Sequence, residues 1–83
     1  MLKRAKSLAQ QRRFQDSIEA YEAVLGAEPT NVNATFGLAN VAKQIGSLDL
    51  AEQFYRATLN LKPDSIEAGN NLAVVLTELE RVD

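Results

Sequence analysis

Apolar residues recur every three or four positions along nearly the whole chain, and no stretch alternates with a period of two. This spacing gathers them on one side of a helix rather than on one face of a strand. The stretch from Phe14 to Leu25, for example, has apolar side chains at positions 14, 18, 21, 24 and 25. The pattern predicts five helices, over residues 1–11, 14–27, 31–45, 48–61 and 65–79 or slightly beyond.

Residues that end helices fall between these segments. Gly46 can adopt the left-handed conformation that often follows the last turn of a helix. Pro29 and Pro63 cannot continue a helix, because proline lacks the backbone N–H and its ring clashes with the preceding turn. Connections of about three residues then make neighbouring helices antiparallel.

Polar residues stand where the helices should begin. We expect Ser47 to cap the helix that follows Gly46, and Thr30 or Asn31 to cap the helix that follows Pro29. Before the last helix, Asp64 is followed three residues later by Glu67, which resembles a capping box.

The chain also repeats itself at a fixed distance. Pro29 and Pro63 stand 34 positions apart, and so do Tyr21 and Tyr55. Helical units of this length cannot bury their apolar faces alone and must stack on copies of themselves. Stacking produces a curved surface that typically holds another molecule, so the period favours a binding function.

A helical hairpin of 34 residues resembles the tetratricopeptide repeat, whose pattern is Trp-x2-Leu-Gly-x2-Tyr, then Ala-x3-Phe, then Pro. The middle unit, residues 32–65, fits that pattern best. Its matching residues are Leu38 and Ala39 at the Leu-Gly pair, Gly46 at the turn, then Ala51, Tyr55, Leu59 and Pro63. In the first unit, Arg4 occupies the leucine position and Arg12 the position of the turn glycine.

The resemblance implies an all-α fold of antiparallel helical hairpins stacked as an α-solenoid. It divides the single domain, residues 1–83, into units of roughly 1–31 and 32–65 and an incomplete third unit over 66–83. Ala39 and Ala51 should face each other across the middle hairpin, while Tyr55 and Leu59 should reach the next unit. We therefore interpret these four residues as packing residues.

The third unit lacks a second helix, so we expect several of its apolar side chains to be uncovered. These are Leu72, Val75, Leu76, Leu79 and Val82. Two alternatives follow: the chain is a segment of a longer array, or it associates with itself through its uncovered terminal helices.

In arrays of this family the first helix of each hairpin lines a concave groove. Carried over, the resemblance implies a peptide-binding groove formed by Asn33, Phe36, Asn40, Lys43, Gln44, Glu67, Asn70, Asn71 and Val74, with Lys6, Gly37 and Glu78 on the same surface. Side-chain amides offer both donors and acceptors, so they can hydrogen-bond a peptide main chain. The alternative is that these asparagines are simply solvated residues near helix starts.

Two specialised forms of this groove can be compared with the sequence. Asn71 sits where the repeats of O-linked N-acetylglucosamine transferases carry a ladder of asparagines, but Gly37 stands at the equivalent position one unit earlier. Chaperone-binding members hold a C-terminal carboxylate in a clamp of basic residues and asparagines. Here Phe36 replaces a lysine of the clamp and Glu67 would repel a carboxylate, so we expect no such clamp. Phe36 is either an anchor for a partner or a core residue turned toward the preceding second helix.

Composition narrows the function classes further. Cysteine and histidine are both absent, which excludes disulfides, thiolate chemistry, histidine-dependent triads and nearly every zinc site. We therefore expect no metal, no cofactor and no catalytic residues. The net charge is −2, but the charges are unevenly distributed, with five basic and no acidic residues in the first 13 positions. We interpret that basic start as a solvated helix face, the alternatives being a nucleic-acid or membrane contact or the remnant of a targeting helix.

Together these features predict a non-catalytic, soluble scaffold that binds a protein or peptide ligand. One alternative is a docking segment of a larger enzyme such as a glycosyltransferase. Another is an RNA-binding pentatricopeptide-type array, which the acidic remainder of the chain disfavours. We expect neither a nucleic-acid partner nor a membrane, since the longest aliphatic run, Leu72–Leu76, is too short to span a bilayer.

Overall fold

The computed structural model describes residues 2–81, and all five predicted helices are present there, with ends within two residues of the prediction. Within this range it contains helices and connecting turns, with no strand. The helices are α1 (Leu2–Gln10), α2 (Phe14–Ala27), α3 (Val32–Gln44), α4 (Leu48–Leu61) and α5 (Ile66–Arg81). The predicted all-α fold is confirmed.

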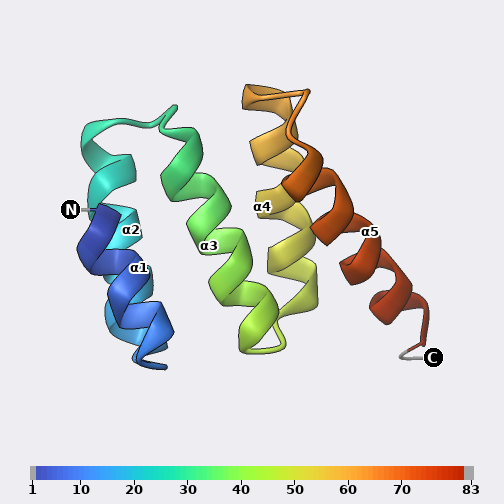
Figure 1. Ribbon diagram of the computed structural model, residues 1–83, viewed down its shortest axis with the longest axis horizontal. Coiled ribbons are helices and arrows are strands. Elements are labelled where there is room, and N and C mark those ends of the chain that lie inside the picture. The colour runs from blue at the N-terminus through green and yellow to red at the C-terminus, as the bar shows by residue number, and fades with distance from the viewer. Residues whose placement is uncertain (1, 82–83) are drawn as a thin grey trace.

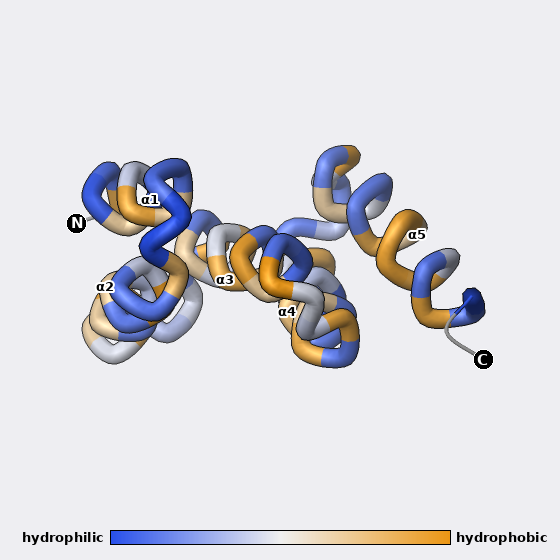
Figure 2. The backbone as a smooth tube through the Cα atoms, turned by 90° about the horizontal axis from the view of Figure 1, so that it is seen from below, coloured by the Kyte–Doolittle hydropathy of each residue, from blue (hydrophilic) through white to orange (hydrophobic). Residues whose placement is uncertain are grey.

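Consecutive helices run antiparallel; α1 lies in front of α2 at the left of Figure 1, and α3, α4 and α5 follow in chain order to the right. Seen along the helices, α1, α3 and α5 form one layer and α2 and α4 form the other, with α3 set back between α1 and α5 (Figure 2). This is the arrangement of stacked hairpins that the 34-residue period requires.

The two hairpin turns both use a left-handed residue. Gly46 has a φ of +83°, as its place after α3 predicts. Arg12 occupies the same position in the first hairpin and has a φ of +63°. A side chain in this region crowds its own backbone, so the first turn carries strain that the second does not.

The helix starts confirm one predicted cap and correct two. Asn31 caps α3, where its Oδ1 accepts a hydrogen bond of 2.9 Å from the Ala34 backbone N–H. Ser47 stands at the start of α4 but its side chain makes no capping hydrogen bond. Before α5 the Ser65 hydroxyl, not Asp64, accepts from the Ala68 N–H at 3.2 Å. Ser65 lies directly before the helix, one residue closer than Asp64.

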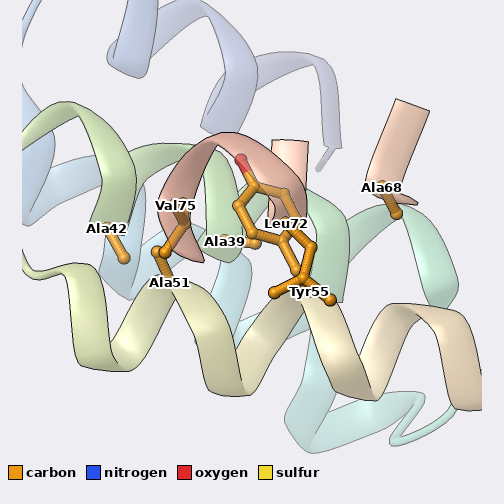
Figure 3. Packing of buried hydrophobic residues seen from close by; sticks show 7 residues of the cluster. All are labelled: Ala39, Ala42, Ala51, Tyr55, Ala68, Leu72 and Val75. Carbon is orange, nitrogen blue, oxygen red and sulfur yellow. The ribbon is translucent and has the colours of Figure 1, made fainter. Parts of the chain in front are cut away.

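Small residues allow the helices of each hairpin to approach closely. Ala39 and Ala51 have no exposed surface and belong to one core cluster (Figure 3). In the first hairpin the matching pair is Ala5 and Ser17, and the Ser17 hydroxyl donates a 2.7 Å hydrogen bond to the Ala5 carbonyl. The hydroxyl is thereby buried without loss of its hydrogen bond.

The core consists of two clusters that meet at Phe54, and each is centred on a tyrosine. The first, between α1, α2 and α3, contains Ala5, Tyr21, Val24, Ala34, Leu38 and Val41. The second, between α3, α4 and α5, contains Ala39, Ala42, Ala51, Tyr55, Ala68, Leu72 and Val75 (Figure 3). Tyr55 is completely buried and joins its own hairpin to α5, which agrees with its predicted packing role.

The expectation that α5 leaves its apolar side chains uncovered is largely wrong. Leu72 and Val75 are buried, and Leu76 and Leu79 are half-buried against the second cluster. They lie on the side of α5 that faces α3 and α4. Val82 lies outside the described residues.

Candidate functional site

The layer formed by α1, α3 and α5 contains a groove of about 460 Å³. It runs between α1 and α3 and reaches the first turn of α5. We call it the α3 groove, and its lining residues are Leu2, Lys3, Lys6, Ala9, Gln10, Tyr21, Asn33, Phe36, Gly37, Asn40, Val41, Gln44 and Glu67.

The structure brings some of the predicted groove residues together and separates others. Five of the nine line the α3 groove, namely Asn33, Phe36, Asn40, Gln44 and Glu67. Lys6 and Gly37, predicted on the same surface, line it as well, whereas Glu78 does not. The other four of the nine, Lys43, Asn70, Asn71 and Val74, do not line it, although Asn70 and Val74 are solvent-exposed on α5.

Sequence reasoning missed most of the groove wall that α1 supplies. Leu2, Lys3, Ala9 and Gln10 line the groove, yet only Lys6 was expected there. A signal was available in the period, because Lys6 and Gln10 lie 34 positions before Asn40 and Gln44.

Asn40 is the centre of a hydrogen-bond network at the groove floor. Its Oδ1 accepts one hydrogen bond from the Tyr55 hydroxyl of α4 and another, of 3.2 Å, from Nδ2 of Asn71 on α5. Burial raises the pKa of Tyr55 above its ordinary value of 10.0, an effect partly offset by a hydrogen bond with the Asn71 side chain. The hydroxyl therefore stays protonated and able to donate through the physiological pH range.

Tyr21, at the same repeat position as Tyr55, makes a different contact. Its ring lies directly over Gly37, so closely that a Cβ at position 37 would overlap the ring. Burial raises the pKa of Tyr21 as well. The ring fills the space that a longer residue at position 37 would need, which is why the asparagine at position 71 has no counterpart here.

Phe36 has a dual position that neither sequence alternative described. It lines the groove and also meets the Tyr55 ring edge-on, with ring centroids 6.0 Å apart. It is half-buried against the second cluster, on the side of its own hairpin rather than against α2. One side of the Phe36 ring thus packs against the core, and the other side lines the groove.

The charges around the groove are unevenly placed. Lys3 and Lys6 project from α1, while Glu67 stands at the start of α5. None of the three forms an ion pair within the described part of the chain. The groove is therefore positive along α1, amide-rich along α3 and negative at α5.

A second hollow, of about 450 Å³, lies between α1 and α2. It is lined by Arg4, Leu8, Arg13, Asp16, Glu19 and Ala20. Arg13 and Asp16 pair there at 2.6 Å, and both are well exposed. Exposed pairs of this kind contribute little to stability, and the two charges largely neutralise each other.

Across residues 2–81 no group of acidic side chains gathers that could hold a metal ion. The same residues include no helix with an apolar stretch long enough to cross a membrane.

Comparison with known proteins identifies the family. A family model described as a tetratricopeptide repeat matches residues 2–66, which is most of the chain. The chain belongs to the tetratricopeptide repeat family. Tetratricopeptide repeats generally mediate protein–protein interaction and are typically non-catalytic.

Two relatives are similar to this tetratricopeptide repeat chain. Protein FlbA of Caulobacter vibrioides is 35% identical over 68 residues, which cover 82% of this chain and 11% of FlbA. Protein bimA of Emericella nidulans is 31% identical over 52 residues, covering 63% of this chain and 6% of bimA. The chain thus corresponds to a small part of either relative.

Proposed function

We propose that this chain is a non-catalytic interaction module that binds an extended segment of a partner protein in the α3 groove. The observation that carries the proposal is the groove itself, in which side-chain amides and one anchored aromatic ring line the same open surface. Membership of the tetratricopeptide repeat family supports the class of partner.

The polar lining suits a peptide main chain. Asn33 and Gln44 are exposed on α3, about three helical turns apart along the groove, and Gln10 faces them from α1. Each amide offers donors and acceptors, as each peptide unit does. A segment that lies along α3 can therefore exchange hydrogen bonds with the amides without a strict demand on its side chains.

Phe36 supplies the apolar contact that such a segment needs. Its edge-on contact with the Tyr55 ring restricts its rotation, so little side-chain entropy is lost when a ligand packs on it. Partly buried aromatic residues of this kind often contribute most of the binding energy at an interface.

Selection from a random peptide library against the folded chain tests the proposal. Backbone amide NMR shifts induced by a selected peptide should map to α1, α3 and the start of α5. The double variant Asn33→Ala/Gln44→Ala should weaken binding about tenfold, since each lost hydrogen bond contributes about 0.5–1.5 kcal/mol.

The matched control is Gln53→Ala/Asn60→Ala, which removes the same two residue types from exposed positions on α4. The affinity of this control variant for the selected peptide should equal that of the unmodified chain. Failure to select any binder, or shifts confined to α2 and α4, would contradict the proposal.

A docking segment of a larger enzyme is the second candidate. The matched segments are a small share of FlbA and bimA, which supports a segment of a longer protein and leaves the enzyme itself as part of the proposal. The groove would then hold a substrate or partner for chemistry performed elsewhere. The sequence of the gene that encodes the chain distinguishes the two candidate functions, because the hypothesis of a docking segment requires a catalytic domain in the same polypeptide.

A further inference from the structure

The side-chain amide of Asn40 is held in one orientation by two other helices. Its Oδ1 receives the Tyr55 hydroxyl from α4 and the Asn71 Nδ2 from α5. A carbonyl oxygen has two lone pairs, so both acceptor positions are filled. Turning the amide over would place its NH₂ against the NH₂ of Asn71, a donor against a donor. With Asn71 oriented as it is here, the network leaves the Nδ2 end of Asn40 available.

The available end is the donor. Nδ2 of Asn40 has no hydrogen-bond partner within residues 2–81. In the same residues no buried side-chain nitrogen or oxygen lacks a partner. Nδ2 is therefore accessible to solvent, and Asn40 lines the α3 groove. At this point Asn40 itself offers an N–H donor, because its own acceptor is already occupied.

We propose that Tyr55 and Asn71 act as positioning residues that present Asn40 to the groove as a hydrogen-bond donor, and that the ligand places an acidic side chain there. This inference rests on the proposed function and adds the chemistry of the ligand. It differs from a clamp on a chain terminus, because one aspartate or glutamate within an extended segment is enough.

Charge favours a carboxylate over a neutral carbonyl at this point. Lys6 lies one repeat before Asn40 in the sequence and lines the same groove, with Lys3 one turn away on α1. Both ammonium groups are exposed. A carboxylate at Asn40 thus has an amide donor, in a groove whose α1 wall carries two cations, and charge-assisted hydrogen bonds are stronger than neutral ones. Glu67, on the α5 side, repels a carboxylate displaced in that direction and so directs it toward α1.

Three fluorescent peptides of equal length test the ligand chemistry. Each has a Gly-Ser backbone with three identical residues at the same positions, which are Glu, Gln or Lys. Fluorescence anisotropy at low salt should give the order Glu, then Gln, then Lys, with about tenfold between Glu and Gln. Equal affinities for the three peptides would overturn the inference.

The variant Asn71→Asp tests the positioning role without a change in the groove lining. The new carboxylate has no donor, so Asn40 must turn its NH₂ toward it and present Oδ1 to the groove. The preference for the Glu peptide over the Gln peptide should disappear and binding of the Lys peptide should strengthen.

Asn70→Asp is the matched control, because it adds the same charge at the adjacent, exposed residue. It should keep the order of the three peptides. Identical changes in both variants would overturn the positioning role, since they would reflect charge alone.

Tyr55→Phe provides a second variant that keeps the buried ring and removes one donor. It should lower the Glu-over-Gln ratio about threefold and shift the side-chain NH₂ resonances of Asn40 in a ¹⁵N spectrum. An unchanged ratio together with unchanged resonances would show that the network does not orient Asn40.

The outcomes separate this inference from the proposed function. If library-selected peptides bind the groove but the Glu peptide does not, the acidic-ligand inference is wrong and the interaction module stands. If neither the selected peptides nor the three defined peptides bind, both are wrong.

Discussion

Replacement of Gly37 by alanine should destabilise the protein, against the normal trend for a glycine within a helix. The new Cβ would overlap the Tyr21 ring and stand 2.6 Å from its hydroxyl oxygen. Alanine gains about 1 kcal/mol over glycine in a helix interior. Overpacking a tight site costs about 1–3 kcal/mol, and Tyr21 has little freedom to move because it is only 5% exposed. The difference between the two is a net loss of up to about 2 kcal/mol.

Two other helical glycines serve as controls. A Cβ at Gly26 or Gly69 would meet nothing within 4 Å. Gly26→Ala and Gly69→Ala should therefore each stabilise the protein by up to about 1 kcal/mol. Urea unfolding followed by circular dichroism gives all three values, with equal denaturant slopes as the check that each variant unfolds in the same way.

The background variant Tyr21→Leu identifies the cause. Leucine lacks the ring atoms that the new Cβ would overlap, so in this background Gly37→Ala should become neutral or stabilising. A double-mutant cycle then gives a coupling energy of about 1–3 kcal/mol. If Gly37→Ala stabilises the unmodified chain as much as Gly26→Ala does, the described contact between the Tyr21 ring and α3 is wrong.

Three further predictions concern the turns, the caps and pH. Gly46→Ala should lower the free energy of unfolding by about 1 kcal/mol, because it puts a side chain in the left-handed region. Arg12→Gly should raise it by about 0.5 kcal/mol, since relief of that strain exceeds the loss of the cation–π contact between Arg12 and the Phe14 ring, whose centroid is 5.9 Å from the guanidinium carbon. Thermal melting measures both. Asn31→Ala should lower the free energy of unfolding by about 1 kcal/mol, because α3 loses its cap. Ser47→Ala should lower it by only a few tenths, because the Ser47 side chain makes no capping hydrogen bond. Equal losses in urea unfolding would contradict this prediction. The pKa of Tyr55 is raised on folding, so the contribution of Tyr55 to stability should be fully present below about pH 10 and be lost above it, because the unfolded chain loses the proton first. Unfolding midpoints across that range should fall less steeply in Tyr55→Phe.

The helices were predictable because their signals are local. The apolar period and the two prolines act within a few residues, so the ends of all five helices came within two residues of the structure. The caps were less predictable. Asp64 and Ser65 can both accept a hydrogen bond from the first turn of α5, and only the backbone path decides between them. Ser47 has the right side chain for a cap and does not use it.

The groove was predictable only in part because its wall depends on two helices. Asn40 and Gln44 were predicted from the family resemblance, in which the first helix of each hairpin lines the groove. The positions 34 residues earlier, Lys6 and Gln10, were equally implied by the period, yet only Lys6 was proposed. Lys43 and Asn70 were placed in the groove by the same argument and do not line it. Rotation of a helix by part of a turn moves such residues from the lining to its edge, and the sequence does not specify that rotation.

The two tyrosines show why repeat equivalence does not determine chemistry. Tyr21 and Tyr55 share a repeat position and are both buried, so the period places both in the packing between helices. The residues at the neighbouring repeat positions differ. Lys6 and Gly37 stand near Tyr21, and the residues 34 positions later, near Tyr55, are Asn40 and Asn71. Glycine leaves room for the first ring, whereas the two asparagines join the second hydroxyl in a hydrogen-bond network. The repeated spacing thus builds the scaffold, and the residues that depart from the repeat determine which groups line the α3 groove.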